Sequence, residues 1–491
     1  MNTGKTNQIE RAPRPGPLPA KRGEGGPRKA GPGEGSVLNP CPSVVKMALP
    51  DLIEIVPLNK PVRAEIAVPG SKSITSRALI LAALADSQVT LKGALWSEDT
   101  QIMVEALRKL GFQVKVASDP EEFCNRTITV KGLGGKIPNG GTAEKPLELF
   151  VSNAGTASRF LSALVCLGNG VYRLHGIPRM HERPQAALFQ ALRELGYRVD
   201  SSNDRLPAVI HSTGPHPGKC RVSMEESSQF ASALLMCSVT AGWQIEIVGE
   251  STEESPYVYM TREMCSYFHW SKKHSSHPEY GMKDGIYPVD PDSSSGSYFW
   301  AAGWIAGKPN QNKPHPVTVA RWPVLGAGSQ IDTNFSNYMP LPETVSRETD
   351  LGDSIMTAIV IAPFADHPVK FTGLGHLRVQ ECDRVSALRA ELTKCGAKVV
   401  EEGDVLTVYP SKLKELHGVE IETHNDHRMA MCFAVLGLKI PGIKIKNPAC
   451  VKKTFPNFFQ KLAEKPPKGL GATILDAKTG RKLKGKELFA D

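Results

Sequence analysis

Long apolar runs are missing from this sequence of 491 residues. The best of them, such as Ala78 to Ala85, reach about half of the roughly 18 residues that a membrane-spanning helix needs. Cysteine is scarce and scattered, with ten residues and no CxxC pair. This argues against a disulfide or zinc scaffold and favours reduced thiols. We therefore expect a cytoplasmic protein with no membrane partner and no metal site.

A strong excess of one charge is also missing from most of the chain. The net charge is +9, and residues 1–46 supply +5 of it, with eight Lys and Arg against three Glu. The other 445 residues carry only +4, interleaved with acids. This distribution is unlike that of a basic nucleic-acid surface, so we expect no nucleic-acid partner.

Residues 1–46 contain few large apolar side chains, together with eight Gly and eight Pro. Such a segment cannot bury enough surface to offset its ordering entropy. It has no apolar stretch typical of a secretory signal, and it contains acids that a transit peptide avoids. We expect a disordered, Gly/Pro-rich basic tail. The alternative is that the protein begins at Met47, just before the strand-like run Ile53 to Val56.

The rest of the chain repeats one pattern six times, at intervals of about 60 to 80 residues. In each repeat a short polar cluster leads into small and aliphatic residues, which is typical of an N-capped, buried helix. The interval fits one βαβ-type unit with additional strands. Three further helices, ending near 111, 196 and 396, are each expected to stop at a Gly. The six polar openings lie at 71–73, 153–156, 227–229, 293–295, 352–354 and 425–428.

Several openings carry a cation in the first helical turn: Lys72, Arg77, Arg159 and Arg428. A cation there opposes the helix dipole and costs stability. Because such cations recur at several openings despite this loss of stability, we infer that free backbone N–H groups and these side chains bind an anion. For 293–295, capping alone explains the opening. Other cations stand in loop-like contexts and suit phosphate or carboxylate oxygens, which predicts a small ligand with several negative charges. These other cations are Arg179, Arg384, Lys452 and Lys453.

Five motifs recur in a recognisable order: Pro69–Ser73 with Arg77, Asn153–Arg159, Ser227–Phe230, Asn425–Met431 and Lys453–Pro456. Each alone is a weak match, but together they closely resemble the 5-enolpyruvylshikimate-3-phosphate synthase family. The resemblance covers about residues 52–465.

The resemblance implies an α/β fold of two similar globular domains, each with three βαβαββ units. Their buried parallel helices form an inside-out α/β barrel and point their N-termini at an active site in the interdomain cleft. The chain is expected to cross between the domains twice, near Pro69–Lys72 and Pro288–Asp292, so that the first strand joins the C-terminal domain. The expected division is 1–46 as a tail, 71–290 as the N-terminal domain, 47–70 plus 291–465 as the C-terminal domain, and 466–491 as a C-terminal tail.

The family joins shikimate 3-phosphate to phosphoenolpyruvate and releases phosphate. The resemblance therefore implies a monomeric transferase of the shikimate pathway that needs no cofactor and is inhibited by glyphosate in the phosphoenolpyruvate pocket. The implied phosphoenolpyruvate contacts are Lys72, Gly155, Arg179, Gln229, Arg384, Arg428 and Lys453. The implied shikimate 3-phosphate contacts are Ser73, Arg77, Ser227, Ser228, Gln229, Tyr257, Asp353 and Gln380.

The reaction requires two proton transfers. The 5-hydroxyl loses a proton as it attacks C2 of phosphoenolpyruvate, and Asp353 fits the role of base. C3 must accept a proton, for which Glu381 and Lys72 are the candidates. Cations then stabilise the departing phosphate.

Three positions on the shikimate side depart from the family's pattern. Gln380 stands where a Lys is common, His376 where an Asn is usual and Glu254 where a Ser is usual. An unfamiliar insertion also lies around His269–Lys283. Three alternatives therefore stay open: a paralogous transferase that acts on another cyclic alcohol, the related transferase that acts on UDP-N-acetylglucosamine, and a non-catalytic anion-binding protein. The second of these usually uses a loop Cys as acid, and the corresponding region, Arg179–Pro184, contains none.

Overall fold

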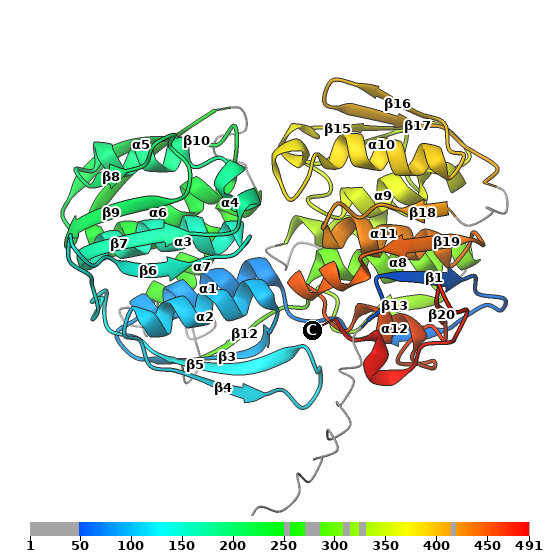
Figure 1. Cartoon of the computed structure of the whole chain (residues 1–491), viewed down its shortest axis with the longest axis horizontal. Helices are drawn as coiled ribbons and strands as arrows, with labels where there is room; N and C mark the ends of the chain where they lie inside the picture. Colours follow the sequence, from blue (N-terminus) through cyan, green and yellow to red (C-terminus); the bar gives the residue numbers. More distant parts are fainter. Residues whose placement is uncertain are drawn as a thin grey trace, which may run out of the picture. The chain divides into compact units, whose positions relative to one another are not determined.

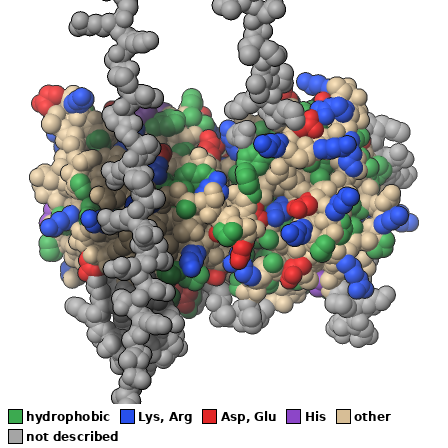
Figure 2. Space-filling model, turned by 90° about the horizontal axis from the view of Figure 1, so that it is seen from below, with side chains coloured by type: hydrophobic (Ala, Val, Ile, Leu, Met, Phe, Trp, Pro, Cys, Tyr) green, Lys and Arg blue, Asp and Glu red, His purple; other side chains and the backbone are tan. Residues whose placement is uncertain are grey.

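The structure is a computed structural model that describes residues 49–249, 256–270, 285–307, 315–323, 330–413 and 419–490 (Figure 1). The expected tail at 1–46, Met47, Glu254 and the insertion beyond residue 270 lie outside these residues. Within them, no helix is long and apolar enough to cross a membrane. On the face shown in Figure 2, Lys and Arg side chains are interspersed with Asp and Glu.

Three sheets belong to the first half of the chain. Two have the same four-stranded plan, in which the first pair of strands is parallel and the other pairs are antiparallel. The third is a parallel pair. The strands, in sheet order, are β12 (Ile286–Pro288), β3 (Gln88–Leu95), β5 (Asn125–Lys131) and β4 (Val114–Ser118); then β6 (Leu147–Phe150), β7 (Asn169–His175), β9 (Ala208–Thr213) and β8 (Arg198–Asp200); then β10 (Gly218–Ser223) and β11 (Trp243–Val248).

The second half repeats this plan, but two of its sheets include strands from the start of the described chain, β1 in one and β2 in the other. β1 and β20, from opposite ends of the described chain, supply the two antiparallel strands of one sheet (Figure 1). The strands are β14 (Thr344–Ser346), β15 (Val369–Thr372), β17 (Val405–Val408) and β16 (Val399–Glu402); then β18 (Val419–Ile421), β19 (Ile443–Lys446), β1 (Leu52–Val56) and β20 (Thr473–Asp476); then the parallel pair β13 (Val317–Val319) and β2 (Ala64–Ile66).

Six buried helices begin at the six predicted openings, which confirms the repeat. Every residue of α3, α9 and α11 is buried, because small and aliphatic side chains surround each helix. The helices pack on one another in two groups of three, so the helices lie inside and the sheets outside. The helices are α1 (Lys72–Leu84), α3 (Gly155–Leu164), α6 (Ser228–Ala241), α8 (Ser293–Gly307), α9 (Ile355–Ile361) and α11 (His427–Gly437).

The remaining helices are only partly buried. Three of them end next to Gly111, Gly196 and Gly396, each with positive φ, as the C-terminal Gly signature predicts. The helices are α2 (Glu98–Lys109), α4 (Pro178–Glu182), α5 (Ala186–Glu194), α7 (Pro256–Trp270), α10 (Arg384–Lys394) and α12 (Phe458–Ala463), with 3-10 helices η1 (Val165–Leu167), η2 (Ile331–Tyr338), η3 (Ala362–Phe364), η4 (Gly375–Val379), η5 (Pro448–Lys453) and η6 (Gly485–Leu488).

Buried apolar side chains form two cores. One contains residues between Ile74 and Val289, and the other contains residues of 49–68 together with residues of 298–490. Two chain segments that connect the cores lie side by side: Ser71 N donates to Asp290 O (2.8 Å) and Asp292 N donates to Pro69 O (2.8 Å).

The segment after residue 465 differs from the expected tail. β20 pairs with β1, and Leu470, Ile474 and Leu483 are buried in the second core. Each such side chain contributes roughly 1.5–3 kcal/mol by leaving water. The expectation of a tail is therefore wrong for this segment, which is part of the folded body.

Candidate active site

A cavity of about 660 Å³ lies where the starts of the buried helices meet. Its wall takes residues from both parts of the chain that build the two cores, including the first residues of α1, α3, α6 and α11 and the loop before α9. All the site residues predicted from the sequence line this cavity except Arg179 and Lys453.

The helix starts at the cavity are only partly satisfied by their caps. Ser227 Oγ accepts from Gln229 N at 3.3 Å, and an Asp426 carboxylate oxygen accepts from Arg428 N at 2.8 Å. The N-cap of α3 is Ala154, whose side chain cannot accept a hydrogen bond. Free N–H groups and the positive ends of the helix dipoles therefore favour an anion in the cavity.

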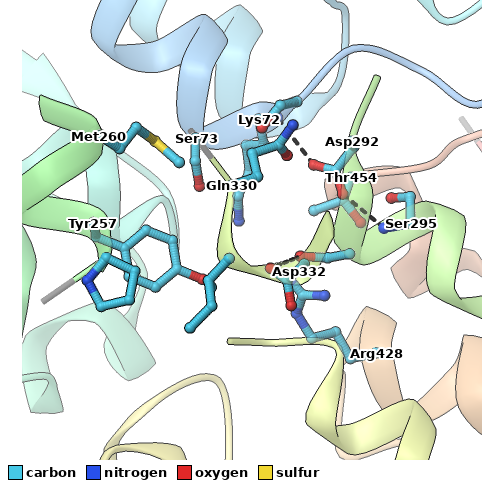
Figure 3. A pocket seen from close by; sticks show the side chains of 14 residues that line it. Lys72, Ser73, Tyr257, Met260, Asp292, Ser295, Gln330, Asp332, Arg428 and Thr454 are labelled. Atoms are coloured by element: carbon cyan, nitrogen blue, oxygen red, sulfur yellow. Dashed lines mark hydrogen bonds between the residues drawn. The ribbon is translucent and has the colours of Figure 1, made fainter. Parts of the chain in front are cut away.

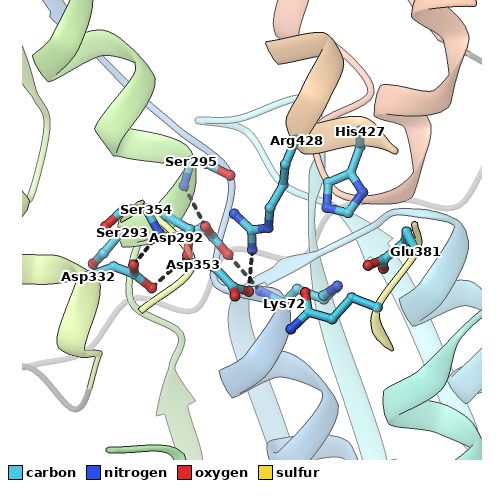
Figure 4. Close-up of polar contacts among 12 residues, drawn as sticks. Lys72, Asp292, Ser293, Ser295, Asp332, Asp353, Ser354, Glu381, His427 and Arg428 are labelled. Carbon is cyan, nitrogen blue, oxygen red and sulfur yellow. Dashed lines mark hydrogen bonds and ion pairs between the residues drawn. The ribbon is translucent and has the colours of Figure 1, made fainter. Parts of the chain in front are cut away.

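Asp353 lies between two guanidinium groups. Arg428 Nη2 is 2.8 Å from one carboxylate oxygen and Arg347 Nη2 is 3.2 Å from the other. Figure 4 shows Arg428 reaching from α11 towards Asp353 beside Lys72. Although burial opposes it, the charges of Arg428 and Arg347 hold the pKa of Asp353 well below its usual range. Asp353 is therefore a carboxylate that can accept a proton.

Glu381 has the same kind of environment on another wall. Its two oxygens contact Lys453 Nζ at 2.7 Å and Arg384 Nη2 at 2.8 Å, and its side chain is only 7% exposed. Despite burial, Lys453 and then Arg384 hold the pKa of Glu381 well below its usual range. Arg384 also contacts Asp426 through Nε at 2.6 Å, which fixes the orientation of its guanidinium.

His427 lies at the first position of α11 and is fully buried. Neither of its ring nitrogens makes a hydrogen bond. Burial lowers its pKa well below 6.5, so the ring is neutral and contributes no charge to the cavity.

Two further arginines lie beside Gly155: Arg159, which the sequence indicated as an anion-binding cation without assigning it to either substrate, and Arg183, which the sequence reasoning did not single out. Arg159 Nη1 donates to Gln229 Oε1 (3.1 Å) and Arg183 Nη1 donates to Asn153 O (3.1 Å), but the Nε atoms of both are buried without a partner. Burial, and then the charge of Arg183, lower the pKa of Arg159 well below its usual value. An anion bound between these two adjacent buried cations would use their free donors and offset their mutual repulsion.

Arg179 lies outside the cavity wall. Its Nε and Nη2 donate to the carbonyl oxygens of Glu381 (3.2 Å) and Gln380 (2.9 Å), so it holds the loop that carries Glu381. Arg183, one turn further along the same motif, takes the place in the wall that was expected for Arg179. Lys453 does not line the cavity; it is buried, and its Nζ contacts Glu381 (2.7 Å) and donates to Asn153 O (3.1 Å).

The wall expected to contact the acceptor contains Ser73, Arg77 and Tyr257. Arg77 donates to Thr261 Oγ1 (2.7 Å), Ser73 O (3.0 Å) and Tyr257 O (3.3 Å), among others. Its donors are thus used to position its neighbours. Lys72, Ser73, Tyr257 and Arg428 also converge on a second, small cavity of about 10 Å³ (Figure 3).

Two of the three residues that depart from the family's pattern, Gln380 and His376, line the large cavity of about 660 Å³. Gln380 Oε1 accepts a hydrogen bond from Arg384 Nη1, so it contributes no cation. His376 lines the cavity, and burial followed by the charge of Arg347 lowers its pKa. The third, Glu254, lies outside the described residues.

Comparison with known proteins identifies the family. The model of the family described as EPSP synthase (3-phosphoshikimate 1-carboxyvinyltransferase) matches residues 56–462. The chain belongs to the EPSP synthase family.

Members of the EPSP synthase family resemble the chain over most of its length. A 3-phosphoshikimate 1-carboxyvinyltransferase of Opitutus terrae is 38% identical over 453 residues, which are 86% of this chain and 100% of that protein. One of Nostoc punctiforme is 36% identical and covers 83% of this chain and 98% of its own.

Solved structures share the fold at lower identity. EPSP synthase from Acinetobacter baumannii has a TM-score of 0.61 at 20% identity and covers 86% of this chain and 99% of its own. The enolpyruvyl transferase NikO from Streptomyces tendae has a TM-score of 0.60 at 14% identity and covers 88% of this chain and 99% of its own.

Proposed function

We propose that this member of the EPSP synthase family transfers the enolpyruvyl group of phosphoenolpyruvate to the 5-hydroxyl of shikimate 3-phosphate and releases phosphate. One observation carries the proposal: a single cavity contains two carboxylates, Asp353 and Glu381, and each contacts two cations. Such a site offers a base, an acid and several positive charges to a reaction between two anions.

The phosphoenolpyruvate subsite is proposed beside Gly155. Arg159 and Arg183 bring two buried guanidiniums with unused donors there, and Gln229 orients Arg159. Lys72, Arg384 and Arg428 supply further charges around the same cavity. Glycine at 155 lets the guanidinium of Arg183 lie close to the start of α3, where it can meet the ligand. A Cβ at this position would lie 2.7 Å from Arg183 Nη2 and would push the guanidinium away.

In the first step, the 5-hydroxyl oxygen bonds to C2 of phosphoenolpyruvate. Its proton passes to Asp353, while the electron pair of the C2–C3 double bond takes a proton at C3. Arg428 holds the Asp353 carboxylate in place, and the neighbouring cations attract the acceptor to it.

The proton for C3 comes from Glu381 or Lys72. Glu381 must first be protonated, and bound phosphoenolpyruvate favours this, because its negative charges compete for Lys453 and Arg384 and so raise the pKa of Glu381. In the second step C3 loses a proton, the double bond forms again and the C2–O bond to phosphate breaks. Arginine and lysine stabilise the departing phosphate.

Phosphate release from phosphoenolpyruvate by the full chain tests the proposal. We expect release to depend on shikimate 3-phosphate and to match the enolpyruvyl ether formed, as measured by mass spectrometry. Asp353→Asn should abolish release, whereas Asp51→Asn, at an exposed position outside the cavity, should not. Absence of release with shikimate 3-phosphate, or equal release without an acceptor, would contradict the proposal.

We further propose that the enzyme works as a monomer in the cytoplasm. The nine cysteines among the described residues are all free thiols, and most are buried, which fits a reducing compartment. The cavity wall supplies the two carboxylates and the cations that the reaction needs without residues of a second chain, which supports a monomer.

A further inference from the structure

Arg347 is a cation of the cavity wall to which the family resemblance assigns no role. It directly follows β14, and its backbone N–H donates to Thr372 O at 3.0 Å, so the strand pair β14–β15 fixes its position. Its side chain is only 11% exposed and reaches the cavity.

The guanidinium of Arg347 has donors to spare. Nη2 donates to Asp353 at 3.2 Å, but Nε is buried without a hydrogen-bond partner. An unpaired donor on a buried cation is costly, and a ligand anion removes that cost. Arg77 in the same wall differs, because its donors are used by protein groups.

The surroundings of Arg347 belong to the acceptor half of the cavity. Its charge acts on Tyr257, where it partly offsets the rise in pKa that burial causes, and on His376, where burial and then Arg347 lower the pKa. Both residues line the cavity together with Ser227 and Ser228, at the positive end of α6. Gln380, where the resemblance leads one to expect a cationic Lys, is neutral and accepts a hydrogen bond from Arg384.

We propose that Arg347 binds the phosphate group of the acceptor, in place of the Lys expected at 380, and releases Asp353 when it does so. The inference rests on the proposed function. Arg347 then selects a phosphorylated acceptor over its unphosphorylated form, and it positions the base only while the acceptor is absent.

The exchange changes the strength of Asp353 as a base. In the unliganded site Asp353 lies in the field of Arg428, Arg347, Arg384 and Lys72, and it also faces Asp332 and Tyr257. A phosphate dianion on Arg347 neutralises one of the two nearest cations, which raises the pKa of Asp353 towards values at which a carboxylate accepts protons well. Acceptor binding and activation of the base are thereby coupled.

The test compares two ligands, shikimate 3-phosphate and shikimate, by calorimetry on the full chain. We expect Arg347→Ala to raise the Kd of shikimate 3-phosphate about 10- to 100-fold. The Kd values of shikimate and of phosphoenolpyruvate should change by less than about twofold. Arg347→Lys, which keeps the charge, should recover part of the loss. The control is Arg389→Ala, which removes a guanidinium paired with Glu401 on the surface, 46% exposed, and should change none of the three values.

The outcomes separate this inference from the proposed function. If wild type binds and turns over shikimate 3-phosphate but Arg347→Ala binds it equally well, the role of Arg347 is wrong and the function stands. An equal loss for shikimate and its phosphate would mean that Arg347 only holds the wall, which also overturns the inference. If wild type does not bind shikimate 3-phosphate, both fail.

Discussion

The effect of Gly155→Ala follows directly from the geometry of the phosphoenolpyruvate subsite. A methyl group at this position would lie 2.7 Å from Arg183 Nη2 and 2.9 Å from Arg183 Cζ, and it would also contact Arg159 Nη1. Both guanidiniums are buried and must retreat by about 1 Å, a displacement that can cost roughly 100-fold in rate. A charge-assisted hydrogen bond contributes about 1.5–3 kcal/mol, and 1.4 kcal/mol is tenfold in affinity, so the KM for phosphoenolpyruvate should rise about 10- to 100-fold.

Glyphosate provides the second measurement for the same variant. We expect wild type to be inhibited competitively with phosphoenolpyruvate, and Gly155→Ala to need more inhibitor, because both anions share the displaced arginines. The thermal midpoint should fall by a few degrees at most, because overpacking costs about 1–3 kcal/mol and the far ends of two flexible side chains can move to relieve it. Titrations of glyphosate at several phosphoenolpyruvate concentrations measure both effects. Wild-type inhibition that does not recede as phosphoenolpyruvate rises, or an unchanged KM in the variant, would refute the placement of Gly155.

Three further predictions concern the charges and the ends of the chain. Lys72→Ala and Arg428→Ala should each abolish turnover, because each variant loses a charge-assisted contact with the ligand of about 1.5–3 kcal/mol. Circular dichroism and the thermal midpoint should show an intact fold. Near-normal activity of either variant would mean that the substituted residue does not belong to the site. Deleting residues 1–46 should change neither activity nor thermal midpoint. Deleting 466–491 should lower the midpoint by several degrees or prevent folding, because it removes β20 and buried core residues. A thermal scan in which the first deletion lowers the midpoint more than the second would contradict the assignment of these segments. The pKa of Glu381 lies below its ordinary 4.5, so ionised Glu381 stabilises the fold above that pH, and this stabilisation is lost as the pH falls. The thermal midpoint of wild type should therefore exceed that of Glu381→Gln at pH 6. A difference between the two midpoints that does not narrow towards about pH 3 would argue against the buried ion pair.

The six-helix plan could be predicted from the sequence because its signals are local. Each buried helix has a polar opening and a uniformly apolar run, and these stand side by side in the sequence. The sheet β18-β19-β1-β20 has no such signal, because β1 and β20 are short and their pairing joins positions more than 400 residues apart. The sequence therefore predicts a tail for the final segment, whereas the structure buries its residues Ile474 and Leu483 in the core.

The site was predictable to the level of the motif and less so to the level of the side chain. Arg179 and Arg183 occupy one short motif around α4, and nothing in their sequence context says which guanidinium faces the cavity. Packing decides it: Arg179 is used by the carbonyls of Gln380 and Glu381, and Arg183 faces Gly155. Pairing of a residue with a distant loop leaves no local signal. For the same reason the role of Arg347 could not be predicted from the sequence, because it depends on the contact of Arg347 with Asp353 and on the cavity that both residues line.

The repeated helix starts differ in what satisfies them, and this difference indicates where a ligand binds. At α8, Ser295 N donates to Asp292 Oδ1 at 2.7 Å, and at α9, Ser354 N donates to Asp332 Oδ1 at 2.6 Å. The protein's own carboxylates thus occupy these two starts, as the capping explanation for 293–295 requires. At α3 the cap is Ala154, a poor N-cap, and two buried guanidiniums with unused donors lie beside the next residue. A helix start that lacks a side-chain cap and is flanked by buried guanidiniums with unused donors is stabilised by an external anion, so α3 is the helix start that most favours a bound substrate.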